Sequence, residues 1–560
     1  MITKNNEKDI DLLTGFLNEN ISDTSLALSK MFHDIIDHKF GNIIYNNIEE
    51  LFNEWLNRGL YPSVETLNIY LNNIFQKYGT NVDELKKDAQ KNIHGLENID
   101  MILLYIASNI NSGSTIEDSI KKYIWISYKK LISIFMIQTS HLIISRFLMY
   151  FVGIDKKAWN TIIIQQVPCP YLDFYWNIRK QMKNHLPLLY DLNEFDWIFF
   201  EENIREQSVN DIQNFIKKYD EILDIHFGRL NKELNMYDYS NIDVDVWKKV
   251  YQKFFSEEDI NKLGFVPTPN EAVDCILNLC DYKNTNKNLC KIKILDPACG
   301  SGTFLVESMA RLLTHLKSKQ SCHEDHKIKN DWERDQRILD TITENLYGID
   351  IHPFSTFLTT INLIFQIIDI YANVKKYNSA YKLNLNIITY DTLSKKPNIR
   401  KQTTWTESTK QKISIERDII FSKIYDKQFD LVVGNPPWGS VLRGGIGPLG
   451  DKNLKKDYKL RYTSAYDKYD IYVLFLERSI NWLNENGTLG MITQNTWVSN
   501  KFGDGIKKVI RSMGMIDIFI DLGTVGDVIF PKYVVFPSIL VYKKKFLGAN
   551  KIKLIEVENR

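Results

Sequence analysis

The sequence predicts an α/β fold in which a doubly wound, mostly parallel sheet with a late antiparallel hairpin follows a mainly α-helical domain. Two observations lead to this prediction. Over residues 1 to about 240, apolar side chains recur at the spacing of helices that bury one face. From about Gly264 onward, short β-branched runs alternate with helix-length amphipathic segments, which is typical of a parallel sheet covered by helices on both faces. We therefore expect a helical domain over 1–240 and a sheet domain over 241–560.

The first few expected strands are each followed by a helix-length segment. The strands fall at 293–295, 346–349, 385–389, 429–433, 488–492 and 516–520. The final part differs, because 534–542 and 552–557 are two strand-like runs joined by the turn residues at 548–550. This spacing predicts an antiparallel pair that closes one edge of the sheet.

The whole-chain composition is that of a soluble globular protein. The chain has 560 residues, of which 44% are hydrophobic and 25% are charged, and this length exceeds one ordinary core. The formal net charge of +1 neither indicates nor excludes nucleic acid, so any positive surface must be local. Six cysteines without a CxxC pair, and no secretory signal, predict reduced thiols in a cytoplasmic protein.

Two other segments resemble a membrane span and a metal site, but neither is predicted to be one. The most apolar stretch, 131–152, contains Gln138, His141 and Arg146, so we expect a buried helix there and no membrane span. Residues 322–326 carry cysteine, histidine and acidic groups. They lack a second pair of ligands, so no metal site is predicted.

A glycine-rich loop follows the first expected strand and precedes a helix. Gly300 and Gly302 allow the backbone to turn tightly and to approach a ligand closely. The third glycine of the dinucleotide-binding pattern is absent, and Asp296 directly after the strand would repel a phosphate. An acid at this position suits a cation such as the ammonium of a bound amino acid. The alternative is an ordinary glycine turn.

Two further acids follow the next two strands. Asp350 ends the second strand, where a carboxylate can accept hydrogen bonds from both hydroxyls of a ribose. Asp391 follows the third strand and could accept from an adenine amine. Either residue alone is more often a helix cap or a turn residue. Three acids at three successive strand ends favour a ligand that contains a nucleoside.

The strongest motif is Asn435-Pro436-Pro437-Trp438, directly after a hydrophobic strand. The two prolines end the strand and leave backbone carbonyls outside the ladder. The Asn435 side-chain oxygen and the Pro436 carbonyl could accept both hydrogens of an aromatic amine, which frees its lone pair to attack a methyl group. Trp438 offers a plane on which an extruded base can stack. We interpret the four residues as a catalytic loop; the alternative is an exposed Pro-Pro turn.

Together these motifs resemble the gamma class of N6-adenine DNA methyltransferases of restriction–modification systems. The resemblance begins near residue 240 and implies S-adenosylmethionine as the cofactor. It implies that Thr268 contacts the cofactor carboxylate, that Phe475 lines the cofactor pocket, and that Phe530 or Phe536 packs on the flipped base. The implied cofactor-binding residues are Thr268, Asp296, Pro297, Gly300, Gly302, Asp350, Asp391 and Phe475.

The long helical half resembles type I modification subunits and single-chain type IIG methylases. This implies double-stranded DNA as a partner, with a separate specificity subunit and a restriction subunit as further candidates. Target choice would come from a specificity subunit, from the helical half or from downstream sequence. The one match to a nuclease signature, Glu84-Leu85-Lys86, is interpreted as a charged helix face.

The expected enzyme is therefore a site-specific adenine DNA methyltransferase, but two other classes share some of its features. The Asn-Pro-Pro-aromatic loop also serves enzymes that methylate adenine in RNA or glutamine in proteins. A non-catalytic DNA-binding assembly subunit could use the same fold as a scaffold. Such a subunit would be expected to have lost Asp296, Asp350 or Asn435, and all three are present.

Overall fold

The computed structural model describes most of the sheet half and several helices of the other half. It describes 7–38, 52, 116–190, 195, 210–240, 242, 268–283, 285–286, 288–318, 330–397, 409–438, 452–530, 535–545 and 552–557. The interpreted helix face at Glu84-Leu85-Lys86 and the polar segment 322–326 lie outside these residues.

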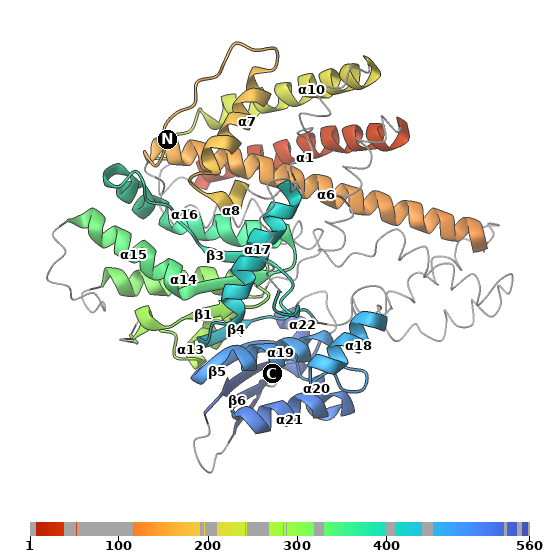
Figure 1. Ribbon diagram of the computed structural model, residues 1–560, viewed down its shortest axis with the longest axis vertical. Helices are drawn as coiled ribbons and strands as arrows, with labels where there is room; N and C mark the ends of the chain where they lie inside the picture. Colours follow the sequence, from red (N-terminus) through yellow and green to blue (C-terminus); the bar gives the residue numbers. More distant parts are fainter. Residues whose placement is uncertain are drawn as a thin grey trace.

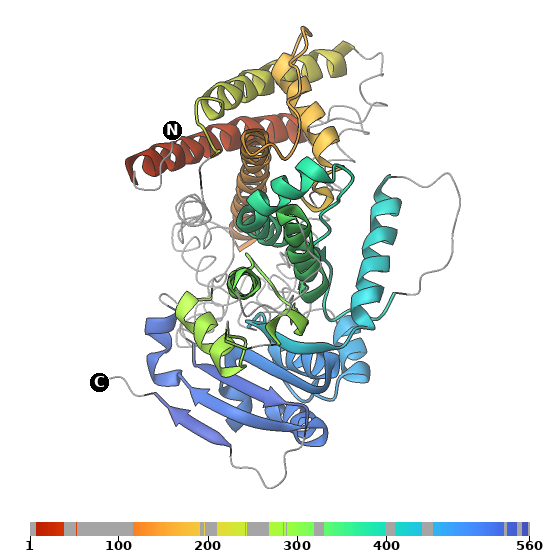
Figure 2. The ribbon, with the colours of Figure 1, turned by 90° about the vertical axis from the view of Figure 1, so that its left-hand side faces the viewer.

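One eight-stranded sheet forms the centre of the second half of the chain, and Figure 2 shows its late strands, coloured blue, at one end of the molecule. Its strand order is β3-β2-β1-β4-β5-β7-β6-β8. The first five strands are parallel, and the chain order reverses between β1 and β4, as in doubly wound folds. The strands are β1 (Ile294–Asp296), β2 (Leu346–Asp350), β3 (Asn386–Thr389), β4 (Phe429–Gly434), β5 (Leu483–Gln494), β6 (Met515–Asp521), β7 (Pro537–Lys543) and β8 (Lys553–Glu556).

The last two strands exist as predicted, but the prediction that they form a hairpin with each other is wrong. β7 runs antiparallel to both β5 and β6, between which it lies. β8 pairs in parallel with β6 at the edge of the sheet. Burial explains the arrangement, because all residues of β7 before Lys543 are buried and require a strand on each side, whereas β8 is exposed throughout.

The described helices cover both faces of the sheet, and those of the N-terminal half lie at the opposite end of the molecule from β5 and β6 (Figure 1). The α-helices are α1 (Glu7–His38), α6 (Ile116–Asp155), α7 (Pro170–Met182), α8 (Pro187–Tyr190), α10 (Asn210–Leu234), α13 (Asn270–Leu279), α14 (Thr303–Lys317), α15 (Asp331–Asn345), α16 (Pro353–Tyr377), α17 (Thr409–Tyr425), α18 (Lys452–Arg461), α19 (Ile471–Trp482), α20 (Thr496–Ser499), α21 (Asp504–Met513) and α22 (Gly526–Ile529). The described part of the chain also contains the short 3-10 helices η2 (Leu289–Lys291), η4 (Lys501–Gly503) and η5 (Gly523–Val525).

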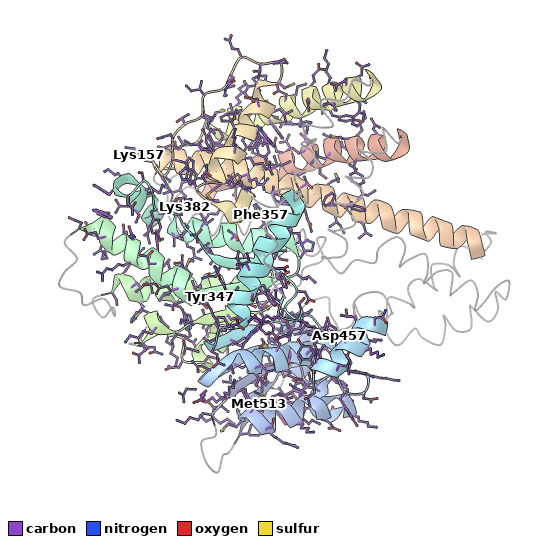
Figure 3. The ribbon with its side chains drawn as sticks, in the orientation of Figure 1. Lys157, Tyr347, Phe357, Lys382, Asp457 and Met513 are labelled. Atoms are coloured by element: carbon purple, nitrogen blue, oxygen red, sulfur yellow. The ribbon has the colours of Figure 1, made fainter. Side chains whose placement is uncertain are left out.

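Neighbouring residues of one strand enter different hydrophobic clusters, as the two-residue period of a strand requires. Ile294 belongs to the cluster that contains residues of α13, α14, α15 and α16, whereas Leu295 belongs to the cluster that contains residues of α17, α19 and α21. Figure 3 labels one residue of each cluster, Phe357 on α16 and Tyr347 on β2. The Tyr347 ring packs edge-on against Phe429, with 5.2 Å between ring centroids. Helices on both faces of a largely parallel sheet confirm the doubly wound prediction.

The apolar stretch at 131–152 lies in α6, and this stretch is buried as predicted. Its Arg146 is fully enclosed, and its Nε donates to the Leu189 carbonyl at 2.8 Å. Within the described residues, the helices Leu131–Asp155 and Pro353–Tyr377 are long and apolar enough to cross a membrane. In each of them, 83% of the apolar 18-residue window is buried inside the protein, as expected for core helices.

The helical half and the sheet half share one continuous hydrophobic core. α6 packs against α16, where the rings of His141 and Phe354 have centroids 6.1 Å apart. Farther along the two helices, Lys156 Nζ and Asp369 Oδ1 form an ion pair at 2.5 Å. The described elements before residue 240 are all helices, and the division at 240–241 stays a prediction.

The cysteines depart in part from the prediction. Cys169, Cys275, Cys280 and Cys299 are free thiols. Cys290 is disulfide-bonded, so the prediction of reduced thiols throughout is wrong at this residue. Spacing along the chain could not reveal this bond, because the fold decides which cysteines meet. Among the residues that the structure describes, no group of three or more His, Cys, Asp or Glu could hold a metal ion.

Candidate active site

The predicted site residues meet at the carboxyl ends of four neighbouring strands. Asp350 ends β2, Asp296 ends β1 and Asn435 follows β4, while Asp391 lies two residues beyond β3. Because the order β3-β2-β1-β4 places these parallel strands side by side, the three acids and the asparagine lie along one edge. This edge includes the point where the chain order reverses, which is where open α/β sheets bind their ligands.

The glycine-rich loop is fixed from two sides. Gly300 and Gly302 have φ values of 54° and 91°, a left-handed conformation that favours glycine. The Gly300 amide donates to Asp350 Oδ2 at 2.9 Å, and its carbonyl accepts from Thr359 Oγ1 at 2.8 Å. A Cβ atom on Gly302 would lie 2.9 Å from Thr359 Oγ1, so a larger residue there would push the loop off α16.

Asp350 organises the loop in addition to the ribose role that the sequence predicts. Its Oδ1 accepts from the His352 amide at 2.8 Å, while Oδ2 accepts from Gly300. Burial raises the pKa of Asp350, and these backbone hydrogen bonds act in the opposite direction. His352 caps α16, because its Nδ1 accepts from the Phe354 amide at 3.1 Å. This cap was not predicted, although the Asp350-Ile351-His352-Pro353 segment carries the proline that often opens a helix.

Asp296 lies between the glycine-rich loop and the end of β4. It is 1% exposed, and its Oδ1 accepts from the Ala298 amide at 3.1 Å. A Cβ atom on Gly434 would lie 2.8 Å from the same oxygen, so only glycine lets the end of β4 approach so closely. Burial raises the pKa of Asp296 to about 8, and the nearby carboxylate of Asp350 adds to the rise. This buried acid fits a cationic group such as an ammonium, which would stabilise its ionised form.

Cofactor affinity should therefore increase with pH between about 6 and 8. Below pH 8 Asp296 is protonated in the cofactor-free protein, and an ammonium ligand requires the carboxylate. Each pH unit below this value is expected to raise Kd roughly tenfold. Titration calorimetry over this range measures the effect. The control is Asp296→Asn, which is neutral at every pH and should bind weakly with a flat profile; a flat profile for the unchanged protein would contradict the role of Asp296.

Asp391 is held in a tight turn beyond β3. Its Oδ1 accepts from the Leu393 amide at 2.9 Å and its Oδ2 from Ser394 Oγ at 3.1 Å. Burial is the largest influence on its pKa and raises it. In the same turn, Thr392 Oγ1 donates to the Pro297 carbonyl at 2.5 Å, which ties this turn to the loop after β1.

Two arginines that the sequence analysis did not identify fasten the Asp391 turn to the helices after the catalytic loop. Arg461 of α18 donates to the Leu393 carbonyl at 2.6 Å, and Arg478 of α19 donates to the Ser394 carbonyl at 2.8 Å. Asp457, labelled on α18 in Figure 3, accepts from Arg461 Nε at 2.8 Å. Phe475, also on α19, is buried in the cluster that contains Leu393.

The Asn435-Pro436-Pro437-Trp438 loop, predicted to be catalytic, presents a buried side-chain acceptor that has no partner among the described residues. Asn435 Nδ2 donates to Thr268 Oγ1 at 3.1 Å, whereas Asn435 Oδ1 is buried and accepts no hydrogen bond. Pro436 is buried, and Pro437 and Trp438 are partly buried. The indole Nε1 of Trp438 is likewise buried and without a partner. An unpaired buried polar atom is costly in a folded protein, and a role toward a ligand or substrate is one reason for keeping it.

The structure brings one of the two aromatic candidates to the catalytic loop. The Phe530 ring packs edge-on against Trp438, with ring centroids 5.0 Å apart and an interplanar angle of 76°. Phe530 is 3% exposed, whereas the side chain of Phe536 is 51% exposed. Sequence reasoning could not distinguish the two, because each phenylalanine lies next to a proline in the same short segment.

Two protein-family models match the part of the chain that contains this site. Residues 344–527 match the family model of the Eco57I restriction-modification methylase, and residues 272–364 match the RMKL-like methyltransferase domain. Together these segments contain Asp296, Asp350, Asp391 and Asn435. Thr268 lies just before the first matched residue.

Curated relatives match over about half of the chain. The type II methyltransferase M.BstVI of Geobacillus stearothermophilus is 28% identical over 296 residues, which are 53% of this chain and 44% of the relative. The type II restriction enzyme and methyltransferase RM.Eco57I of Escherichia coli is 28% identical over 326 residues, or 51% of this chain and 30% of the relative. This chain thus spans less than half the length of either relative.

One solved structure, the methyltransferase subunit of a type I restriction-modification system from Streptococcus thermophilus, aligns with 97% of this chain and 87% of its own. It has 12% identity and a TM-score of 0.40. The fold, the acids at the strand ends and the family matches agree with one another. Residues 272–527 are similar to the methyltransferase domain of restriction–modification methylases, and the acids at the strand ends agree with S-adenosylmethionine as the cofactor.

Proposed function

We propose that the protein transfers a methyl group from S-adenosylmethionine to the N6 amine of a flipped adenine in double-stranded DNA. It would do so as the modification component of a restriction–modification or phage-defence system. The observation that supports this proposal is the buried Asn435 Oδ1, which has no partner among the described residues. Asn435 directly follows Gly434, the end of β4, which lies close to the Asp296 carboxylate. The names of the relatives, which are restriction–modification enzymes, favour DNA over RNA or protein as the substrate.

The chemistry required of this chain is to place acceptors around a weak nucleophile. The lone pair of an adenine amine is delocalised into the ring, so the nitrogen must become pyramidal before it attacks. Asn435 Oδ1 and the Pro436 carbonyl would accept one hydrogen each and stabilise that geometry. Positioning and preorganised dipoles then supply the rate enhancement, and no strong base is needed. When bound, S-adenosylmethionine would supply the methyl group from its sulfonium and leave as the neutral thioether S-adenosylhomocysteine, while the methylated nitrogen, which is then strongly acidic, would release one proton to water.

Trp438 and Phe530 are the proposed faces for the extruded base. Enzymes that modify a base take it out of the stack, since its amine is not accessible inside a duplex. The two rings touch edge-on, so they must separate to admit a base between them. Phe536 is the less suitable candidate because half of its side chain faces solvent.

Phe530→Leu should lower kcat/KM for DNA roughly tenfold or more, because base–aromatic stacking contributes about 1–3 kcal/mol. The matched variant Phe536→Leu should stay within about twofold of the unchanged protein. Steady-state methyl transfer at saturating cofactor measures both variants. Melting temperature and cofactor affinity serve as controls for the loss of packing at the buried Phe530. Equal effects of the two variants, or a larger effect at Phe536, would contradict the assignment.

Phosphate contacts are proposed for the basic helix that follows the catalytic loop. Lys455, Lys456 and Lys459 on α18 are exposed, and this helix is fastened to the Asp391 turn through Arg461. Neutralising DNA phosphates releases counterions, so DNA binding should weaken steeply as salt increases. A separate specificity subunit and a restriction subunit remain proposed partners, and the cytoplasm is the proposed location.

The experiment that tests the function combines two measurements on the full chain. Purified protein, together with any specificity subunit encoded beside it, is incubated with radiolabelled S-adenosylmethionine and unmethylated duplex DNA. Label should appear as N6-methyladenine. Single-molecule sequencing of host DNA with and without the gene then gives the target sequence. Cofactor binding without any transfer to DNA would overturn the proposal, and transfer to RNA or protein would replace it.

A further inference from the structure

The turn that carries Asp391 is held by a network of side chains that the proposed chemistry does not use. The sequence resemblance implies that Asp391 binds the cofactor, where its carboxylate could accept from the adenine amine. Both carboxylate oxygens already accept from residues farther along the turn. Oδ1 accepts from the Leu393 amide at 2.9 Å, and Oδ2 accepts from Ser394 Oγ at 3.1 Å. The positions of Leu393 and Ser394 therefore decide where the carboxylate lies.

Two arginines and a tyrosine hold the backbone carbonyls of these same two residues. Arg461 of α18 donates to the Leu393 carbonyl at 2.6 Å, and Arg478 of α19 donates to the Ser394 carbonyl at 2.8 Å. Tyr462 Oη lies 3.2 Å from the Leu393 carbonyl oxygen. A carbonyl can only accept, so the tyrosine hydroxyl is the donor in that contact. The two residues that orient the carboxylate are thus themselves held from α18 and α19.

Arg478 is the centre of this network, and its contacts have only one possible direction. A guanidinium has no acceptor, so the Tyr462 hydroxyl oxygen accepts from Arg478 Nε at 3.0 Å while its hydrogen goes to Leu393. Arg478 is 7% exposed, and its guanidinium carbon lies 4.8 Å from the ring centroid of Tyr425 and 5.4 Å from that of Trp482. These rings hold the guanidinium in place without neutralising its charge.

The turn is also anchored on the side of the cofactor loop, and its charge balance suits an acceptor. Thr392 Oγ1 donates to the Pro297 carbonyl at 2.5 Å, so the turn is fixed between the loop after β1 and the two helices. Burial raises the pKa of Asp391, and the positive charges of Arg461 and Arg478 act in the opposite direction. An ionised carboxylate accepts hydrogen bonds at both oxygens, as recognition of an amine requires.

We propose that Arg461 and Arg478 are positioning residues that aim the Asp391 carboxylate at the 6-amino group of the cofactor's adenine. The two guanidinium groups act through the backbone of the turn and not by contact with the cofactor. Hydrogen-bond lengths span only about 0.5 Å, so a carboxylate displaced by about 1 Å no longer recognises the amine. Selectivity for adenine then depends on the helices that follow the catalytic loop. This inference rests on S-adenosylmethionine as the cofactor and does not depend on DNA as the acceptor.

The first test measures base selectivity in binding and needs no turnover. Titration calorimetry compares S-adenosylhomocysteine with an analogue in which purine replaces adenine, because purine lacks the 6-amino group. The unchanged protein should bind the adenine compound roughly tenfold or more tightly, the usual effect of one hydrogen bond to a charged group. Asp391→Ala should lose this preference. If either expectation fails, Asp391 does not recognise the amine and the inference is overturned.

The decisive variants are Arg478→Gln and Arg461→Gln, which remove the charge and the long donor but keep a polar side chain. Each should reduce the preference for adenine over purine to about threefold or less, by weakening the adenine compound alone. Tyr462→Phe, which removes the linking hydroxyl, should give an intermediate ratio. Arg461 is 18% exposed, so Arg461→Gln decides the matter even if Arg478→Gln does not fold. An undiminished preference in the folded arginine variants would overturn the proposal.

Arg311→Gln is the matched control for a merely structural loss. Arg311 is 7% exposed, like Arg478, and it also donates to a backbone carbonyl, that of Tyr282, at 2.7 Å. It joins α14 to α13 through Asn278, at 3.0 Å. Arg311→Gln should lower the melting temperature and leave the ratio of the two affinities unchanged.

Equal weakening of both compounds in Arg478→Gln and Arg461→Gln would mean that these arginines only stabilise the fold, and would overturn the proposal. The proposed methylation of DNA fails separately, because it is measured by transfer of label to a duplex, whereas the binding ratio is measured without DNA.

Discussion

Asn435→Ala is expected to reduce kcat for methyl transfer by roughly 10²–10³-fold, the usual loss when one preorganised hydrogen-bonding group of an active site is removed. The physical reason is that the buried Asn435 Oδ1 has no partner among the described residues and is the predicted side-chain acceptor on this loop for an amine hydrogen. Steady-state and single-turnover transfer of labelled methyl groups to DNA both measure the loss.

Cofactor affinity is the control for this variant. Asn435 contacts Thr268, and the glycine-rich loop is fixed by Asp350 and Thr359 without it. The Kd for S-adenosylmethionine should therefore change by less than about threefold, a difference below 1 kcal/mol. Undiminished kcat would rule out the acceptor role. A loss of cofactor binding as large as the loss of kcat would mean that the loop belongs to the cofactor site and not to the acceptor site.

Asp350→Ala is expected to weaken cofactor binding by roughly 100-fold or more. The carboxylate accepts from the Gly300 and His352 amides at 2.9 and 2.8 Å, so its removal leaves two backbone donors without these partners. An unsatisfied buried donor costs about 1–3 kcal/mol. The same change removes the proposed acceptor of the ribose hydroxyls. Titration calorimetry gives the affinity, and chemical denaturation gives the change in the free energy of unfolding.

Asp350→Asn is the matched variant for this prediction. Its one amide oxygen can replace only part of the carboxylate, because the nitrogen end cannot accept from Gly300 or His352. An intermediate loss of affinity is expected, with a smaller loss of stability than in Asp350→Ala. If Asp350→Ala bound the cofactor as tightly as the unchanged protein, the ribose role and the support of the glycine-rich loop would both be wrong.

The residues at the strand ends could be predicted from the sequence because each lies next to a recognisable strand. Asp296, Asp350 and Asn435 follow short hydrophobic runs, and parallel strands bring their carboxyl ends to one edge. The acceptor role of Asn435 follows from the chemistry of its amide and the two prolines after it. The roles of Asp296 and Asp350 toward the cofactor and of Asn435 toward the base remain predictions. The structure supplies the geometry that makes these roles testable.

What the sequence could not predict depends on contacts between distant segments. The hairpin of β7 and β8 was expected from a local turn, but β6 competes for β7 and gains a buried partner. The hydrogen bond from Asn435 to Thr268, the choice of Phe530 over Phe536 as the neighbour of Trp438, and the arginines that hold the Asp391 turn all join residues far apart in the chain. A local sequence pattern cannot predict contacts between residues that are far apart in the chain.

Helix α16 has a consequence for attempts to redesign this enzyme by exchanging its parts. One end follows Asp350, its second turn holds the Gly300 carbonyl through Thr359, and its outer side packs against α6 and pairs Asp369 with Lys156. A chimera that replaced the N-terminal helices with those of another methylase would therefore also replace the support of the cofactor loop. Chimeras should keep α6 and α16 from the same parent, and crossovers placed elsewhere should preserve cofactor binding better than a cut at residue 240.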